Sequence, residues 1–181
     1  MDRLRIATCW LSGCAGCHMS FMDLDEFLFD IAKIADVVYS PVVDVKEYPT
    51  NVDVCLVEGA VANHDNLEQI RLIRERTRIL VSFGDCAVTA NVPAMRNPLG
   101  PTNVQTVLER AYLDPTNLRP RIPAEEGILP SLLPRVMPIH EVVPVDVFLP
   151  GCPPSADRIR AAVLQIVTGQ LPADAPKLAF G

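Results

Sequence analysis

Three runs of strand-like residues each lead into a loop that carries cysteine, and this repetition restricts the fold of the chain more than any other feature. The runs cover residues 4–8, 78–83 and 145–150, which are mostly aliphatic or aromatic. The cysteines that follow the three runs are, in order, Cys14 with Cys17, then Cys86, then Cys152. If the runs are parallel strands of one sheet, these loops open on the same edge, where open α/β sheets bind ligands.

Four thiolates brought to one point by three loops match the ligand set of a Cys₄ iron–sulfur cluster. The C-x-x-C spacing of Cys14 and Cys17 is weak evidence alone, because thioredoxin-like redox motifs share it. Single cysteines far apart in sequence differ from the closely spaced pairs of structural zinc sites. The pattern therefore favours a buried iron–sulfur cluster over inert cysteines. The glycines that would let the backbone approach such a cluster are Gly13, Gly16, Gly84 and Gly151.

The composition excludes several other functions. The chain has 181 residues, enough for one domain with a substantial core. Its net charge of −6 and the lack of a Lys/Arg run argue against a nucleic-acid partner. No stretch approaches the roughly 18 apolar residues of a membrane span, and the first residues do not resemble a secretory signal. We therefore expect a cytoplasmic protein without membrane contact, whose six cysteines are reduced and available for metal or redox chemistry.

Helical and strand patterns alternate in the first part of the chain. Ser20 is expected to cap a helix in which apolar residues repeat at helical spacing from Phe21 to Ile34. That apolar stripe is wide, so we expect part of it to pack on the sheet and the remainder to face a partner. Residues 36–43 and 52–58 are predicted to be strands, the second of them buried on both faces.

The same patterns continue in the second part. Asp65, with Glu68 three residues later, resembles a capping box at the start of another helix. The remaining predictions are a helix over residues 102–113 after Pro101, no assigned structure over residues 114–144, and a last helix over residues 156–168 between a Ser155 cap and Gly169.

This order of elements predicts a flavodoxin-like, doubly wound α/β fold with a mostly parallel sheet, in a single domain over residues 1–181. A proline-rich insertion is expected before the last strand, because many of the 17 prolines fall between Pro93 and Pro154. We interpret these prolines as stiff, ordered loops that lie over the sheet or against a partner.

Several residues close to the predicted ligands have alternative roles. His18 could donate to a cluster sulfide or relay a proton, or could be an ordinary polar residue at an interface. Glu58 could line the cluster pocket or a proton route, or could cap a neighbouring helix or loop. Trp10 could cover the cluster, or anchor the core or an interface. Cys55 is expected to be a core residue and Cys9 a spare cysteine.

Four motifs of the chain resemble those of the small subunit of nickel–iron hydrogenases. They are Cys14–Cys17, Val57–Ala60, Gly84–Ala87 and Pro150–Pro154. The resemblance extends over most of the chain and is greatest to the short small subunit of cytoplasmic, bidirectional, NAD-linked hydrogenases. In those proteins W-L-S-G-C-x-G-C-H is typical, and the same stretch here runs from Trp10 to His18.

The resemblance implies an electron-transfer subunit. In that family the matching cysteines, here Cys14, Cys17, Cys86 and Cys152, hold the proximal [4Fe–4S] cluster. Hydrogen is split at a nickel–iron centre in a separate large subunit, and diaphorase subunits with FMN and further clusters deliver the electrons to NAD⁺. We therefore expect this chain to hold one [4Fe–4S] cluster and to bind such subunits, without splitting hydrogen itself.

Departures from the family limit what carries over. Membrane-bound and periplasmic small subunits carry a twin-arginine signal and a C-terminal domain with two more clusters. This chain shows neither, and no cysteine follows Cys152. Those subunits usually have a glutamate where this chain has Met19, so no role of that glutamate carries over. The related complex I subunit has two adjacent cysteines in its first motif, unlike the C-x-x-C here.

Alternative functions follow from the same residues. The chain could serve another soluble nickel–iron hydrogenase with a different acceptor, or a complex I-related quinone reductase. A thiol–disulfide oxidoreductase would use Cys14 and Cys17 and leave Cys86 and Cys152 dispensable. An FMN-binding module ranks low, because the first loop carries cysteines in place of a Thr/Ser-rich phosphate cradle. A scaffold without a cofactor would not explain cysteines at three strand ends.

Overall fold

A parallel sheet forms the centre of the molecule. The computed structural model describes residues 3–100, 102–114, 116, 118–125 and 127–168. The sheet has five strands in the order β2-β1-β3-β5-β7, with every neighbouring pair parallel. They are β1 (Leu4–Trp10), β2 (Ala35–Tyr39), β3 (Val52–Glu58), β5 (Thr77–Phe83) and β7 (Val147–Leu149). The chain changes direction across the sheet between β1 and β3, as in flavodoxin-like doubly wound folds, which confirms the predicted fold class.

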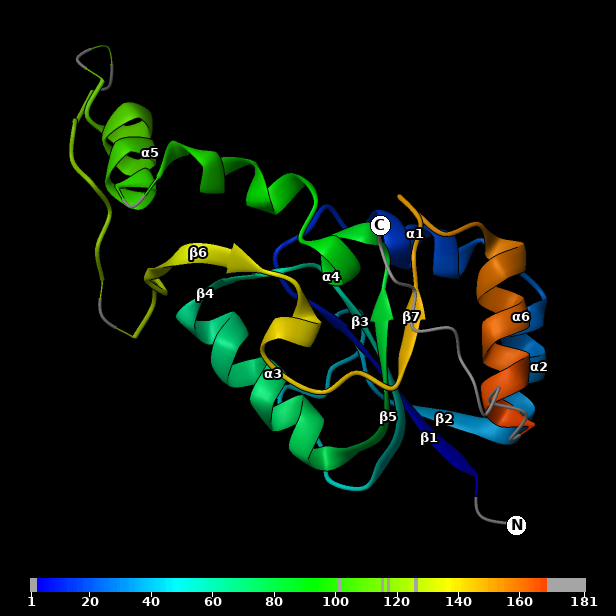
Figure 1. Cartoon of the computed structure of the whole chain (residues 1–181). Helices are drawn as coiled ribbons and strands as arrows, with labels where there is room; N and C mark the ends of the chain where they lie inside the picture. Colours follow the sequence, from blue (N-terminus) through cyan, green and yellow to red (C-terminus); the bar gives the residue numbers. More distant parts are fainter. Residues whose placement is uncertain (1–2, 101, 115, 117, 126, 169–181) are drawn as a thin grey trace.

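Helices cover both faces of this sheet (Figure 1). One face carries α1 (Gly16–Met22), α2 (Phe27–Ile34) and α6 (Ala156–Val167), and the other carries α3 (His64–Arg76). Successive strand residues point to opposite faces, so Ile6 packs in one core and Ala7 in the other. Because both faces are covered, β3 is almost continuously buried, as predicted. Among the described residues, no helix is long and apolar enough to cross a membrane.

The proline-rich insertion has more regular structure than predicted. The part of the chain between β5 and β7 contains α4 (Asp85–Thr89), η1 (Val92–Leu99), α5 (Asn103–Tyr112), β6 (Leu132–Met137) and η2 (Ile139–Glu141). β6 pairs antiparallel with β4 (Val61–Asn63). Both β6 and η2 fall within residues 114–144, for which the sequence predicts no element. The pairing joins segments far apart in the chain, so no local pattern reveals it, and Pro134 is tolerated because β6 is an edge strand.

Arg96 and Asn97 connect this insertion to the small sheet. The Arg96 guanidinium donates to the carbonyl oxygens of Ala62 at 3.2 Å and Leu133 at 2.7 Å, one in each of its strands. The Asn97 amide exchanges two hydrogen bonds of 2.9 Å with the backbone of Val136. Figure 1 shows η1 and α5 extending away from the main sheet. Contacts at the base of this arm therefore set its direction.

The first predicted helix is divided in two. α1 ends at Met22 and α2 begins at Phe27, with Asp25 between them at a φ of 49°. Ser20 is not a helix cap, because it lies inside α1 and its hydroxyl donates to the carbonyl oxygen of Pro154 at 2.5 Å. The cap prediction was wrong because this hydroxyl makes a hydrogen bond with a loop distant in the chain, which local sequence cannot reveal.

Two other helix starts differ in detail. Asn63 caps α3, since its side chain accepts the backbone N–H of Asn66 at 2.8 Å, and Asp65 lies inside the helix. Ser155 occupies the predicted N-cap position of α6 but makes no side-chain capping hydrogen bond to the described residues. The predicted stop at Gly169 lies outside the described residues.

β2 and β7 are shorter than predicted. They end at Tyr39 and Leu149, just before segments that contain Pro41 and Pro150. Proline has no backbone N–H to donate to a neighbouring strand, so the ladder stops there.

Candidate metal centre

Three loops converge at the carboxyl end of the main sheet, where β1, β5 and β7 end (Figure 1). The loops after β5 and β7 are joined directly. The N–H of Gly84 donates to the Leu149 carbonyl at 2.8 Å, and the N–H of Asp85 to the Gly151 carbonyl at 2.9 Å. In return the Gly151 N–H donates to Oδ1 of Asp85 at 2.7 Å. These bonds hold the second and third cysteine loops in one arrangement.

The first cysteine loop is joined to the end of β3 and to the third loop. Ser12 and Ala60 exchange two backbone hydrogen bonds of 3.1 and 2.7 Å. A Cβ on Gly59, whose φ is +91°, would lie 2.8 Å from the Ser12 carbonyl oxygen, so this crossing requires glycine. The hydroxyl of Ser20 then ties α1 to Pro154. All three loops are therefore connected by hydrogen bonds.

Gly84 makes room for Cys17. A Cβ placed on Gly84 would overlap with the Cys17 Sγ, and Gly84 has a φ of +83°. Any side chain at this position would displace the sulfur. Cys17 is thereby buried against the start of the loop that carries Cys86.

The four predicted ligands influence one another electrostatically. Burial, followed by the charges of the Glu58 carboxylate and of the other three thiolates, raises the pKa of Cys17 to about 12. Burial also raises the pKa of Cys86, to which the charges of Cys14, Cys152 and the same carboxylate add. The charges of thiolates on all three loops therefore act on Cys17 and on Cys86. Their joint ionisation is unfavourable unless positive charge lies among them, as a metal cluster would provide.

The four thiols of Cys14, Cys17, Cys86 and Cys152 form the donor set of this candidate centre. Among the described residues, no three His, Cys, Asp or Glu side chains are close enough to hold one metal ion. A zinc ion with Zn–S bonds of about 2.3 Å would need its four sulfurs within about 4 Å of one another. In a [4Fe–4S] cluster each cysteine binds a different iron, so its sulfurs lie farther apart. By its chemistry, a donor set of four cysteines fits an iron–sulfur cluster.

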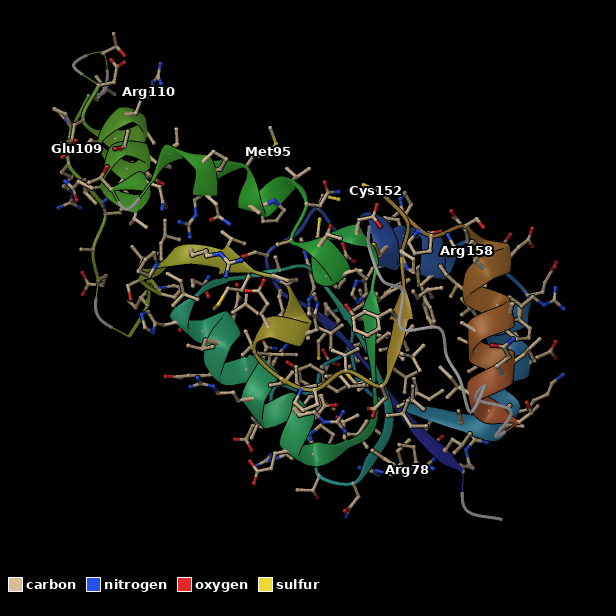
Figure 2. All side chains as sticks on the ribbon, viewed as in Figure 1. Arg78, Met95, Glu109, Arg110, Cys152 and Arg158 are labelled. Atoms are coloured by element: carbon tan, nitrogen blue, oxygen red, sulfur yellow. The ribbon has the colours of Figure 1, made fainter. Side chains whose placement is uncertain are left out.

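N–H groups lie close to the more exposed sulfurs. The backbone N–H of Gly16 donates to the Cys14 Sγ at 3.4 Å. The side-chain amide of Asn91 donates to the Cys152 Sγ at 3.8 Å. Figure 2 shows Cys152 at the end of the molecule toward which β5 and β7 point. Hydrogen bonds to ligand sulfurs are one of the means by which proteins set the potential of a cluster.

Glu58 and His18 form a largely buried pair beside this centre. Glu58 is the last residue of β3 and is 1% exposed. Its Oε2 accepts the backbone N–H of His18 at 2.9 Å and lies 2.5 Å from Nδ1 of the same residue. Glu58 thus satisfies an unpaired N–H in the first turn of α1 and also raises the pKa of Cys17. The His18 Nε2 is buried without a hydrogen-bond partner in the described part of the chain.

The two remaining cysteines lie away from the cysteine edge. Cys9 and Cys55 are fully buried in the core on the α3 face, and the Cys55 Sγ donates to the Cys9 Sγ at 3.8 Å. This hydrogen bond and burial raise the pKa of Cys9. The Cys9 thiol therefore stays protonated at neutral pH, and both cysteines pack as small core side chains.

Exposed apolar side chains surround the cysteine edge. Trp10 at the end of β1 is 45% exposed, Met19 in α1 is 64% exposed and Met95 in η1 is 74% exposed. Figure 2 shows Met95 and Cys152 at the same end of the molecule. Exposed methionine and tryptophan are typical of interface cores. In contrast, much of the apolar stripe predicted over residues 21–34 packs inside the domain.

A cavity of about 420 Å³ lies elsewhere, between the main sheet and the helices α1, α2 and α6. Aliphatic side chains form most of its lining. Its polar groups include His18 and the hydroxyls of Thr8 and Ser40, which are hydrogen-bonded to each other at 3.0 Å. No cysteine in the described ranges lines this cavity, but His18 does, so the cavity reaches the side of the candidate metal centre.

Three residues of the centre escape prediction from the sequence. Asp85 joins two cysteine loops, and its position directly before Cys86 is a sequence signal that could indicate a role at this centre. Ser20 joins α1 to the third loop, and Asn91 contacts a ligand sulfur. Both contacts cross between loops distant in the chain, so no local pattern indicates them.

Comparisons with known proteins agree on the kind of subunit that the chain resembles. The model of the family "NADH ubiquinone oxidoreductase, 20 Kd subunit" matches residues 14–166. The delta subunit of the NAD-reducing hydrogenase HoxS of Cupriavidus necator is 36% identical over 180 residues, covering 96% of this chain and 83% of that protein. A subunit of the F420-non-reducing hydrogenase of Methanothermobacter thermautotrophicus is also 36% identical, covering 93% of this chain. This chain spans 55% of that methanogen protein.

Solved structures show the same likeness. A chain of an NAD⁺-reducing [NiFe]-hydrogenase in the H₂-reduced state superposes with a TM-score of 0.87 and 40% identity, with 93% of each chain covered. A chain of the [NiFeSe]-hydrogenase of Desulfomicrobium baculatum superposes with a TM-score of 0.56 and 16% identity, which indicates a shared fold only. It covers 94% of this chain and 64% of that one.

Proposed function

Because this chain belongs to the family of the 20 kDa subunit of NADH ubiquinone oxidoreductase and, within it, to the hydrogenase small subunits, we propose that it relays electrons in a cytoplasmic, NAD-reducing nickel–iron hydrogenase. The electrons move between the Ni–Fe site of a large subunit and diaphorase subunits that carry FMN and further iron–sulfur clusters. The observation that carries this proposal is the convergence of four interacting cysteines at one sheet edge.

One proximal [4Fe–4S] cluster is the cofactor of this proposal. Its ligands are Cys14, Cys17, Cys86 and Cys152, and a single domain over residues 1–181 holds it. When bound, the cluster supplies one-electron oxidation and reduction. The bonds between the three loops hold the cysteine-bearing segments together, which would limit the rearrangement that each electron transfer requires.

Glu58 and His18 have a supporting role in this proposal. The carboxylate lies against Nδ1 of His18, so the proton of the imidazole is held at that nitrogen. The buried Nε2 then carries a lone pair and can accept a proton from a donor. Both residues thus stay candidates for a proton route beside the electron route. Glu58 also positions the first turn of α1 through the backbone N–H of His18.

The apolar surface around the cysteine edge supports a partner at this end of the domain. Trp10, Met19 and Met95 would be covered by the large subunit, which brings its nickel–iron site close to the cluster. The diaphorase subunits are proposed from the NAD-reducing relatives, whose names state that activity.

A different electron acceptor is the second candidate function. The F420-non-reducing hydrogenase subunit of Methanothermobacter thermautotrophicus is as similar in sequence to this chain as the HoxS subunit is. The 40% identity and the TM-score of 0.87 with a chain of an NAD⁺-reducing [NiFe]-hydrogenase favour the NAD-linked system. A complex I-related quinone reductase and an FMN-binding module rank lower. A thiol–disulfide enzyme needs a nucleophile of lowered pKa, whereas burial raises the pKa of Cys17.

Anaerobic production with its partner subunits, followed by separation of this chain from them, tests this proposal. This chain should contain about four irons and about four acid-labile sulfides, and reduction should give a paramagnetic signal. Cys86→Ala should abolish the signal, whereas Cys9→Ala should keep it, because Cys9 lies in the core. A colourless wild-type protein without iron would contradict the proposal. Reduction of NAD⁺ by hydrogen in the complex then distinguishes the first acceptor from the second.

A further inference from the structure

The turn that follows α4 has an unusual backbone. Ala90 has a φ of 63° and Asn91 a φ of 22°, so two successive residues with side chains adopt positive φ angles. Residues other than glycine avoid such angles because the Cβ crowds the backbone. Strain of this kind persists where the surrounding structure maintains it, and it concentrates at functional sites.

The strained turn directs N–H groups toward two sulfurs on different loops. The backbone N–H of Val92 is hydrogen-bonded to Cys86 and lowers the pKa of that thiol, against the effect of burial. The side-chain amide of Asn91 donates to the Cys152 Sγ at 3.8 Å, a long distance that the large sulfur atom still allows. Residues 91 and 92 therefore supply donors to the ligands of the second and third loops.

We propose that Asn91 is a residue that tunes the cluster potential by donating its amide N–H to the sulfur of Cys152, an inference that rests on the function proposed above. Reduction adds one electron and no proton to the cluster, so the negative charge on the ligand sulfurs increases. An N–H donor stabilises the reduced form more than the oxidised form, and the reduction potential rises. Asn91 acts through Cys152 and does not itself bind iron.

The neighbouring residue provides a matched control. Ala90 shares the strained backbone, but its methyl group has no hydrogen to donate to a sulfur. Ala90→Gly therefore relieves strain and leaves the donor in place. Asn91→Gly relieves strain and removes the donor. If the turn had only a conformational role, the two substitutions would have similar effects on the potential.

Asn91→Asp is the second variant, because it preserves the size of the side chain. It replaces the N–H donor with a carboxylate oxygen, which repels the negative charge of the ligand sulfur. This variant keeps the test possible if the glycine variant fails to assemble a cluster.

The experiment is a redox titration of the cluster in the assembled complex, followed by its paramagnetic signal, with iron and sulfide counted in each sample. We expect Asn91→Gly to shift the midpoint potential to a more negative value and Asn91→Asp to shift it further, while Ala90→Gly leaves it at the wild-type value. An unchanged or more positive potential in Asn91→Gly, with the iron content intact, would overturn the role of Asn91 and leave the relay function standing. A wild-type protein without iron would overturn both.

Discussion

The six cysteines of this chain fall into two groups that share their chemistry and differ in their place on the sheet. Cys9 and Cys55 lie within strands, where alternation turns them into the core on the α3 face. The other four, which we call the edge cysteines, lie beyond the strand ends: Cys14 and Cys152 in loops, Cys17 in α1 and Cys86 in α4. Position relative to the strand end, rather than residue type, therefore separates core thiols from candidate ligands.

The pairing within each group follows from this difference. Cys9 and Cys55 form one hydrogen bond between their two sulfur atoms. Burial and the charges of other edge cysteines raise the pKa values of Cys17 and Cys86, and the edge sulfurs accept N–H groups from Gly16, Val92 and Asn91. Mutual repulsion disfavours the thiolate forms of these cysteines, whereas nearby N–H groups favour them. This combination suits sulfurs that bind a positively charged inorganic core.

The largest expected effect is the different response of the edge and core cysteines to substitution by alanine. Cys14→Ala removes an exposed side chain, so the unfolding free energy of the apoprotein should stay within about 0.5 kcal/mol of the wild type while the cluster is lost. Cys55→Ala removes a fully buried thiol and should cost about 1 kcal/mol or more, with the iron content unchanged. Urea unfolding of the apoproteins and iron analysis of the complexes check both. Loss of iron from Cys55→Ala would contradict the distinction between core and edge cysteines.

Gly84→Ala should have the next largest effect. The new Cβ would overlap with the Cys17 Sγ at a φ of +83°, so both steric overlap and backbone strain oppose it. We expect a loss of about 3 kcal/mol or more of unfolding free energy, together with reduced iron content. Gly100→Ala is the control, because Gly100 has a similar φ of +81° but open space around its Cβ position, and should cost only about 1 kcal/mol. Equal losses in the two variants would contradict the close contact with Cys17.

The stability of the apoprotein should depend on alkaline pH. The pKa of Cys17 is raised from 9.0 to about 12 in the folded state, so the buried neutral thiol contributes fully below pH 9. Above that pH the unfolded chain loses the proton first, and this contribution falls by up to about 1.4 kcal/mol per pH unit until the pH passes the folded pKa. Urea titrations from about pH 8 to about pH 11 should show a shallower decline for Cys17→Ala than for the wild type. Parallel curves would disprove the burial of this thiol.

Ser20→Ala should have the smallest effect. It removes the hydrogen bond between α1 and the Pro154 carbonyl, which is worth about 1 kcal/mol, and leaves the acceptor unpaired. Ser155→Ala is the matched control, since its side chain makes no capping bond in the described part of the molecule, and thermal unfolding should change little. A larger loss for Ser155→Ala than for Ser20→Ala would count against the described link between the loops.

The parts that could be predicted from sequence are those that depend on local pattern and on sheet topology. Strand-like runs with helical stretches between them predict the parallel sheet, and the cysteine positions predict which loops meet. Residues 52–58 are predicted to form a strand buried on both faces, because apolar side chains lie on both faces. In the structure β3 has the same bounds.

The parts that could not be predicted depend on contacts between distant segments. The ladder between β4 and β6 joins residues near 62 and 134, which are far apart in the chain. Pro134 lies inside β6 and interrupts the residue pattern that would have indicated a strand. Ser20 resembles a helix cap in sequence, but in the structure its hydroxyl donates a hydrogen bond to the carbonyl oxygen of Pro154. Asn91 lies in a strained turn that no propensity favours, and its contact with Cys152 exists only after two loops have folded together.

A chain that retains only the edge cysteines gives the most direct test of the account. The double variant Cys9→Ala, Cys55→Ala should be produced anaerobically with its partner subunits, separated from them, and analysed for iron and acid-labile sulfide. We predict about four of each and a paramagnetic signal after reduction, because the edge cysteines alone bind the cluster. A correctly folded double variant without iron, or with a single zinc ion, would contradict the central claim.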